Sequence, residues 1–378
     1  MKLFQRLLVA PAALGLLVPF SANANEVNLN EISNYSDVES IEFANFNNDI
    51  STESNLLAGG EGLMDDHDHS SDDSFSSTTS ASFSVDMAIG SVDGNASETV
   101  GTAYGYQIDL STSFTGEDSL DVAIKSGVGA GPLSELDLNS NGAGLAVDGI
   151  SYTFPVGDIM TAIVGDNTDG SALFTTACAY GGPSNTLDDC GNVNAAITNG
   201  GAMAGASYDF DNGLTAAIGY AGAETSLMTK ETTDAYGANL AYTADNYGVS
   251  LTYGLIETSA TAEDTYTALN AYYSLDNGMS ISAGYEVGDI GGAAATADES
   301  INYFVGVNGE VGPGELGVAL GTSGGQVEGQ DEELMYEAYY SYPVNDGMTI
   351  TPLIYQKEQA TAGTPDQTGF MVKTSFSF

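Results

Sequence analysis

The sequence is short of positive charge and of several chemically versatile residues. Its 378 residues contain no tryptophan, two histidines and six basic residues, against 52 aspartates and glutamates, so the formal net charge is -46. Its one arginine is Arg6. A chain this acidic repels phosphate backbones, so nucleic-acid binding, which needs clustered lysine and arginine, is excluded. Charge of one sign also attracts counter-ions, which here are cations.

Histidine is confined to the N-terminal part of the chain. His67 and His69 stand among aspartates, and no histidine follows them. A Ser-His-Asp or Cys-His arrangement, or a zinc site with histidine ligands, is therefore excluded from the rest of the chain. The pair could bind a divalent metal weakly, but we favour a solvated acidic segment. We expect no enzyme activity and no cofactor, with sugar hydrolysis by two carboxylates as a formal alternative.

Long apolar runs are also missing. A transmembrane helix needs a run of about 18 apolar residues, and none occurs. The apolar stretch Leu7–Phe20 is shorter and contains two prolines. It follows Lys2 and Arg6 and precedes small residues at 22–24, which is the arrangement of a secretory signal. We expect residues 1–24 to be a signal peptide. If the rest of the chain crosses a membrane, we expect it to cross as β-strands.

Cysteine is scarce as well, with Cys178 and Cys190 alone. A secreted chain enters an oxidising compartment, so we expect a disulfide between these two residues. A reactive thiol or a metal site has less support, because no histidine, lysine or arginine lies nearby in sequence to lower a thiol pKa.

Two compositions divide the chain after residue 24. Residues 25–80 are acidic and rich in asparagine and serine, which predicts a disordered periplasmic segment. From residue 81 to residue 378, apolar residues alternate with small or polar ones, as at 83–89 and 104–110. That period of two is typical of strands with one apolar and one polar face.

The connections between these stretches alternate between tight and long. The tight ones carry the Asn-Gly and Asp-Gly chemistry of hairpin turns, as at 211–213, 276–278 and 345–347. The longer ones lie near 165–201, 223–233, 257–264, 289–299, 322–332 and 358–367. Short turns at one end and long loops at the other are typical of outer-membrane barrels. We predict an all-β fold, a transmembrane antiparallel β-barrel of about 16 strands over residues 81–378, with a water-filled lumen.

The final strand ends on an aromatic row. Phe370, Val372, Thr374, Phe376 and Phe378 share one face of it. A terminal strand of this kind resembles the assembly signal of bacterial outer-membrane proteins, with Phe376 and Phe378 as its aromatic end. The resemblance implies the barrel-assembly machinery as a partner. The terminal strand of an ordinary β-sandwich is the alternative.

Charged residues on the polar rows are the candidate functional residues. If the apolar rows face lipid, the other rows face the lumen. The predicted pore-lining residues are Asp86, Asp109, Asp121, Lys125, Glu286, Glu337 and Lys373. Acids exceed bases in this set, and fixed negative charge in a narrow passage attracts cations and rejects anions. We predict a cation-preferring pore, unless these acids are paired or lie near the mouths, where salt screens them.

Three segments carry a family resemblance: Asn25–Asn30, Gln107–Gly116 and Tyr152–Asp158. They look like segments of cyanobacterial Som-type porins, relatives of the carbohydrate-selective OprB family. The resemblance implies a pore in the outer membrane of a Gram-negative, cyanobacterial cell. It also implies a trimer that passes ions, carbohydrates and other small nutrients.

The chain departs from this family in two ways. Ile32–Val38 resembles the opening of an S-layer homology module, but the tryptophan-containing continuation of that module is absent. Arginine is also absent after the signal region. Neither anchoring to the cell wall nor anion transport is therefore carried over.

The longest connection, about Gly165–Gly201, contains both cysteines together with Asp166, Asp169, Asp188 and Asp189. In sixteen-stranded porins the third external loop folds into the barrel and narrows it. The resemblance makes this segment a candidate constriction loop, stiffened by the disulfide. An exposed surface loop with no transport role is the alternative.

Together these features predict an outer-membrane porin, a homotrimer in contact with membrane lipid, that lets cations and small hydrophilic solutes diffuse passively. The alternative is a secreted or surface acidic β-protein, such as a calcium-stabilised adhesin, whose carboxylates would bind cations. The sequence contains no fixed-period repeat of the solenoid kind to support it.

Overall fold

The computed structural model describes residues 78–95, 98–128, 131–138, 142–198, 200–229, 233–291, 298–323, 326–327, 332–359 and 363–378. The predicted signal peptide, nearly all of the predicted acidic segment, and His67 and His69 lie outside the described residues. No helix within the described ranges is long and apolar enough to cross a membrane.

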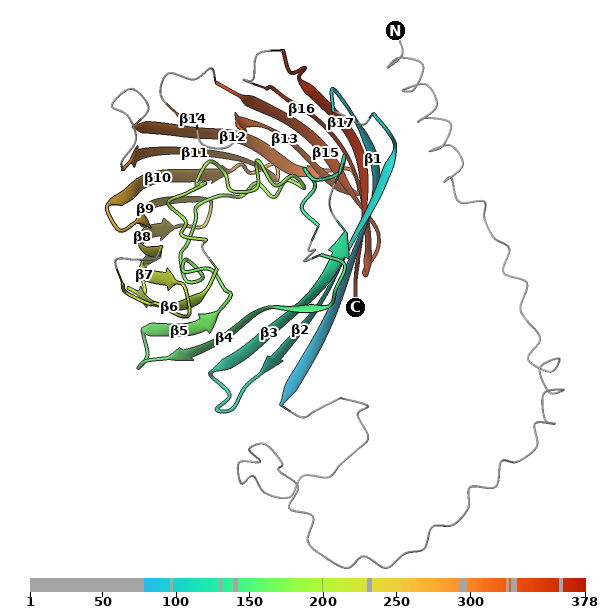
Figure 1. The fold of residues 1–378 in the computed structure, drawn as a ribbon. Coiled ribbons are helices and arrows are strands. Elements are labelled where there is room, and N and C mark those ends of the chain that lie inside the picture. Colours follow the sequence, from blue (N-terminus) through green and yellow to red (C-terminus); the bar gives the residue numbers. More distant parts are fainter. Residues whose placement is uncertain are drawn as a thin grey trace, which may run out of the picture. The chain divides into compact units, whose positions relative to one another are not determined.

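The regular elements of the described chain are strands, joined in one antiparallel sheet (Figure 1). They are β1 (Thr79–Asp93), β2 (Gly101–Thr112), β3 (Ser119–Val128), β4 (Ala146–Pro155), β5 (Met160–Asp166), β6 (Ala202–Asp209), β7 (Leu214–Gly222), β8 (Asp234–Thr243), β9 (Tyr247–Ser259), β10 (Ala262–Ser274), β11 (Met279–Ile290), β12 (Glu299–Val311), β13 (Gly314–Thr322), β14 (Gln326–Val327), β15 (Leu334–Asn345), β16 (Met348–Lys357) and β17 (Gln367–Ser377).

The sheet closes on itself because β1 pairs with both β2 and β17. The short β14 pairs with β12 just beyond the stretch where β13 pairs with it, so β13 and β14 occupy one position in the wall. The fold is thus a closed antiparallel barrel of sixteen strands, which confirms the predicted fold class. At the seam, Phe83 and Phe378 exchange two backbone hydrogen bonds of 2.9 and 3.0 Å.

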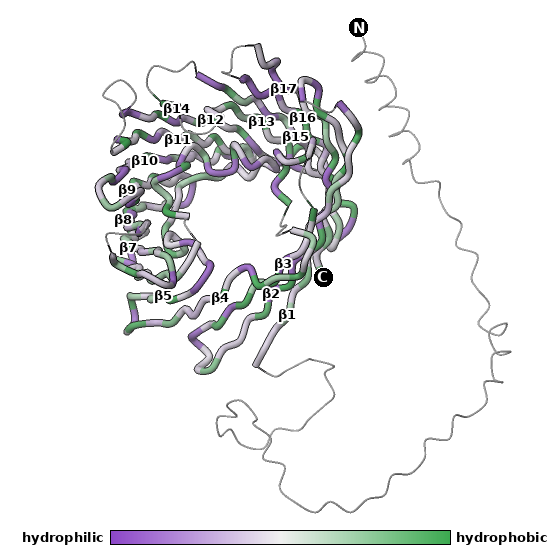
Figure 2. Tube along the Cα trace, viewed as in Figure 1, coloured by the Kyte–Doolittle hydropathy of each residue, from purple (hydrophilic) through white to green (hydrophobic). Residues whose placement is uncertain are grey.

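The period of two in the sequence separates an outer from an inner face of the wall. In β9, Val249, Leu251 and Tyr253 are exposed on the outside, whereas Ser250 and Thr252 are buried on the inside. Figure 2 shows the same alternation of apolar and polar residues along the other strands. An apolar outside and a polar inside are what a barrel in a lipid bilayer requires.

Short turns lie at the end of the barrel where β1 begins and β17 ends. The longer loops lie at the opposite end. Positive backbone φ at Asp211 and Gly213, of 58° and 84°, shows why a tight turn forms there. One prediction of a loop was wrong: β9 and β10 leave only Ala260 and Thr261 between them. Glu257 pairs with Glu263 across this hairpin, so strand pairing continues into a stretch whose polar composition resembled a loop.

Candidate functional site

The connection between β5 and β6, residues 167–201, lies inside the barrel, where Figure 1 shows it as the green to yellow-green trace within the ring of strands. We name it loop 3. Its backbone is hydrogen bonded to inward-facing side chains of β8, β9, β10, β11 and β12. The Thr175 amide donates to Asn239 on β8 at 3.0 Å. The Ala177 amide donates to the hydroxyl of Ser250 on β9 at 2.9 Å. The Ala179 amide likewise donates to the hydroxyl of Ser282 on β11 at 2.9 Å.

Glu286 on β11 is the most heavily bonded carboxylate beneath loop 3. It accepts the backbone amides of Asn194 and Ala195 at 2.8 Å each, and the side-chain amides of Asn194 and Asn302 at 2.9 Å each. Its exposure is 0%. Glu286 therefore points into the barrel, as the alternation of apolar and polar residues along its strand predicts, but loop 3 covers it.

Glu337 on β15 has a similar position. It accepts a hydrogen bond of 2.6 Å from the hydroxyl of Tyr180 in loop 3, and its exposure is 2%. These two acids hold the loop to the wall, and neither has an open surface toward the lumen.

The wall is also shaped to receive loop 3 closely. A Cβ atom at Gly284 on β11 would overlap the carbonyl oxygen of Cys190, so only glycine allows the loop to lie at this depth. The side-chain amide of Asn270 on β10 donates to the same carbonyl at 2.8 Å. Cys190 is joined to Cys178 by a disulfide, which closes the part of the loop between them.

An apolar side of loop 3 packs against the wall and leaves an acidic side toward the lumen. Leu187 and Cys190, each 1% exposed, lie in one buried cluster with Phe304 of β12. The two residues between them, Asp188 and Asp189, are exposed on the other side. Their side chains are open to the lumen, but the surrounding barrel replaces much of the water near them. This partial desolvation raises the pKa of Asp188 to about 7 and that of Asp189 to about 6.

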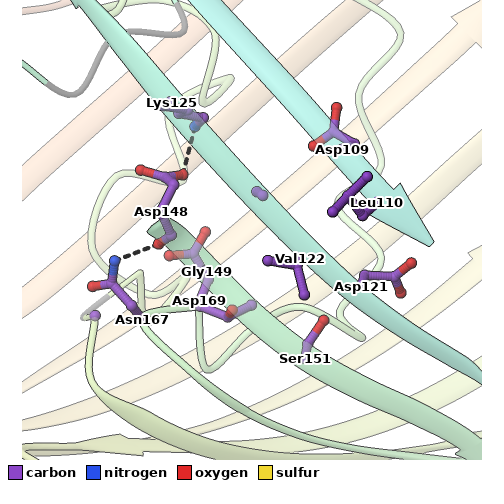
Figure 3. Close-up of a pocket in the computed structure, with 13 residues that line it drawn as sticks. Asp109, Leu110, Asp121, Val122, Lys125, Asp148, Gly149, Ser151, Asn167 and Asp169 are labelled. Atoms are coloured by element: carbon purple, nitrogen blue, oxygen red, sulfur yellow. Dashed lines mark hydrogen bonds and ion pairs between the residues drawn. The ribbon is translucent and has the colours of Figure 1, made fainter. Parts of the chain in front are cut away.

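The wall of β2 to β4 carries a second acidic group, around a polar cavity of about 510 Å³ (Figure 3). Asp109 and Asp121 line it, as does Asp169 at the start of loop 3. Lys125 also lines it, but its Nζ lies 2.7 Å from a carboxylate oxygen of Asp148. Burial raises the pKa of Asp169, which the nearby Lys125 opposes. The lysine is thus neutralised by one acid, and three others remain around the cavity.

The remaining sequence-predicted residues have separate positions. Asp86 on β1 is buried and accepts a hydrogen bond from Ser375 on β17. Lys373 on β17 donates to the backbone oxygen of Asp137 at 3.2 Å. Asp166 is the last residue of β5 and lies outside loop 3. Asp86, Glu286 and Glu337 are thus buried and hydrogen bonded, whereas Asp109, Asp121 and Asp169 lie around the cavity.

The basic groups of the described barrel do not balance its acids. Two ion pairs occur among the described residues, Lys125 with Asp148 and Lys357 with Glu135. No arginine is present in the described ranges. In the same ranges, no group of three or more His, Cys, Asp or Glu side chains is placed to hold a metal ion. The arrangement can attract cations diffusely, without a fixed metal site.

The polar residues that hold loop 3 were not among the residues predicted from the sequence. Asn239 and Asn270, which contact loop 3, and Asn302, which contacts Glu286, interrupt otherwise regular strands, and asparagine is disfavoured in strand centres. An asparagine in the inward row was thus an available signal that a backbone segment lies against the wall at that point.

Comparison with known proteins gives one family and a consistent fold. A model of the family described as Gram-negative porin matches residues 46–358. No curated protein sequence matches the chain. Among solved structures, OprB of Pseudomonas putida is similar at 11% identity with a TM-score of 0.62, over 80% of this chain and 94% of that one.

Two further solved structures agree with this result. A porin variant of Rhodopseudomonas blastica is similar at 14% identity and a TM-score of 0.54, over 79% of this chain and 100% of that one. A loop-deletion variant of OmpT, an outer membrane protein of Vibrio cholerae, is similar at 10% identity and a TM-score of 0.57, over 80% and 99% of the two chains. At such identities, the likeness is one of fold alone.

Proposed function

We propose that this chain, which belongs to the Gram-negative porin family, forms a pore that prefers cations. As a member of that family it is an outer-membrane channel for passive diffusion, and not an enzyme. The preference for cations goes further than the family does, and it depends on the charges of the lumen.

The observation that carries this proposal is the uncompensated acidity of two groups of side chains, one on loop 3 and one on the barrel wall. Asp188 and Asp189 lie on the exposed side of loop 3, while Asp109 and Asp121 lie on the wall of β2 and β3. The lysine nearest the second group, Lys125, is already paired. Fixed negative charge between low-dielectric walls concentrates cations and excludes anions.

We extend the proposal to the finer properties that the sequence resemblance implies. The pore passes small hydrophilic solutes, including carbohydrates, and assembles as a homotrimer in a cyanobacterial outer membrane. Residues 1–24 direct secretion, and the barrel-assembly machinery inserts the chain by its final aromatic strand. Support for these properties comes from the sequence. The outer surface of the barrel gives no support to the alternative of a secreted acidic β-protein. Leu251, Leu269 and Ile218 are exposed there, which suits contact with lipid.

Planar-bilayer recording with a KCl gradient tests the cation preference. We expect stepwise currents and a reversal potential of the sign that K⁺ sets. A reversal potential of the sign set by Cl⁻ would overturn the preference, and absence of current steps from correctly folded protein would overturn the pore itself.

A further inference from the structure

A second loop also lies inside the barrel. The connection between β3 and β4 contains the described residues 131–138, which we name loop 2. Its backbone pairs with loop 3: the Asp137 amide donates to the Pro183 carbonyl at 3.0 Å, and the Asn185 amide donates to the Glu135 carbonyl at 2.9 Å. The two loops therefore form a short two-stranded contact of their own.

Apolar side chains fix loop 2 to the inner wall. Leu133, Leu136 and Leu138 are 1%, 3% and 5% exposed, and they belong to one buried cluster with Met335 of β15 and Met371 of β17. Such burial stabilises the loop in this position, because each leucine removed from water contributes about 1.5–3 kcal/mol. Loop 2 is thus part of the inner surface of the pore, alongside loop 3.

A single lysine joins both loops to the barrel. The Nζ of Lys357, the last residue of β16, lies 2.9 Å from Oε2 of Glu135 in loop 2 and 3.2 Å from Oγ1 of Thr186 in loop 3. The Thr186 hydroxyl donates in turn to Oε1 of Glu135. The side chains of Lys357 and Glu135 are 21% and 11% exposed, so salt screens this ion pair less than a surface pair.

We propose that Lys357 is a positioning residue that locks loops 2 and 3 together, so that the two loops form one wall of the constriction. The inference rests on the proposed pore function and deepens it. Glu135 neutralises the charge of Lys357, so the lysine acts on permeating ions through the position of the loops. Breaking the lock leaves the two loops held by their backbone hydrogen bonds and by the buried leucines, so both loops fluctuate more within the passage.

Three single variants separate this positioning role from a plain charge effect. Lys357→Gln removes a positive charge from the lumen, Glu135→Gln removes a negative charge, and Thr186→Val changes no charge. A lock predicts that all three change single-channel current in the same direction, toward greater current noise and a wider spread of conductance. We expect the fraction of time outside the main conductance level to rise about five-fold in each, which corresponds to about 1 kcal/mol.

Two rescue variants complete the test. Lys357→Arg keeps the contacts with both loops, and the double variant Lys357→Glu with Glu135→Lys keeps an ion pair of reversed order. Both should return the noise toward that of the unmodified channel. Folding of each variant is checked by its compact mobility on unheated gels, and Thr186→Val serves as the test if the charge variants fail to fold.

The outcomes distinguish this inference from the proposed function. If the unmodified channel conducts and the three single variants have its noise and conductance, the lock is overturned while the pore remains. The lock is also overturned if Lys357→Gln and Glu135→Gln shift the reversal potential in opposite directions with no change in noise, because that is a pure charge effect. Absence of current from the unmodified channel would instead overturn the pore.

Discussion

Glu286 differs from the acids around the lumen because it is completely buried and its four hydrogen bonds all come from amide groups. Glu286→Gln replaces one carboxylate oxygen with an amide nitrogen. This nitrogen faces two N–H groups and cannot accept a hydrogen bond from either of them. Buried donors without a partner cost about 1–3 kcal/mol each. We expect a lower unfolding temperature in detergent and increased channel noise.

Asp276→Asn is the matched control for this variant. It makes the same carboxylate-to-amide change at an exposed residue of the turn between β10 and β11. This control should behave as the unmodified protein does. If Glu286→Gln behaved in the same way as the control, Glu286 would not be one of the residues that hold loop 3.

Asp188 and Asp189 predict a pH dependence of the channel. Their pKa values are raised to about 7 and about 6, by burial first and then by neighbouring acids. A carboxyl with a raised pKa is charged above that pKa and neutral below it. As the pH falls from about 8 to about 5, the lumen therefore loses up to two negative charges, and we expect the cation preference to weaken across this range.

The measurement is the reversal potential in a KCl gradient at a series of pH values. The double variant Asp188→Asn with Asp189→Asn should have a weaker preference at high pH and a flatter dependence on pH. An unchanged pH profile in this double variant would assign the titration to other groups, such as Asp169.

At the scale of elements, the absence of a side chain at Gly284 is one of the features of the wall that let loop 3 lie at its depth. Gly284→Ala places a methyl group where the carbonyl of Cys190 lies, so the loop or the strand must shift. Overpacking of this kind costs about 1–3 kcal/mol. We expect a less stable barrel with an altered conductance. Gly181→Ala, in the same loop with open space around its Cβ position, is the control and should leave both properties unchanged.

The elements were predictable from sequence to the extent that they depend on local patterns. The alternation of apolar and polar residues is local, so the strands and the inward direction of Glu286 and Glu337 followed from it. What covers an inward residue is not local. Tyr180 in loop 3 and Glu337 on β15, which are hydrogen bonded to each other, are 157 residues apart. The sequence pattern therefore does not distinguish a loop inside the barrel from one on the surface, and it gives no sign of loop 2.

At the scale of the whole molecule, the barrel depends on one seam, because closure removes the free edges that an open sheet would expose. β1 and β17 pair over Ser84–Asp93, and Phe83 stacks on Phe378 at a ring separation of 5.6 Å. Deleting Phe378 removes this stack and both backbone hydrogen bonds to Phe83. The free energy of unfolding decreases by about 1–3 kcal/mol. The lost contacts lie where β1 and β17 must meet to close the barrel.

We expect this deletion to lower the temperature at which the barrel in detergent loses its compact mobility on gels. Phe378→Ala keeps the backbone pair and should have a smaller effect, while Phe378→Tyr keeps both the pair and the stack and should have almost none. The same series, measured as the amount of protein in the outer membrane, separates closure from assembly. If Phe378→Ala is stable after refolding in detergent but absent from the membrane, the aromatic ring serves recognition by the assembly machinery. If its membrane level simply follows its stability, the ring serves closure of the seam.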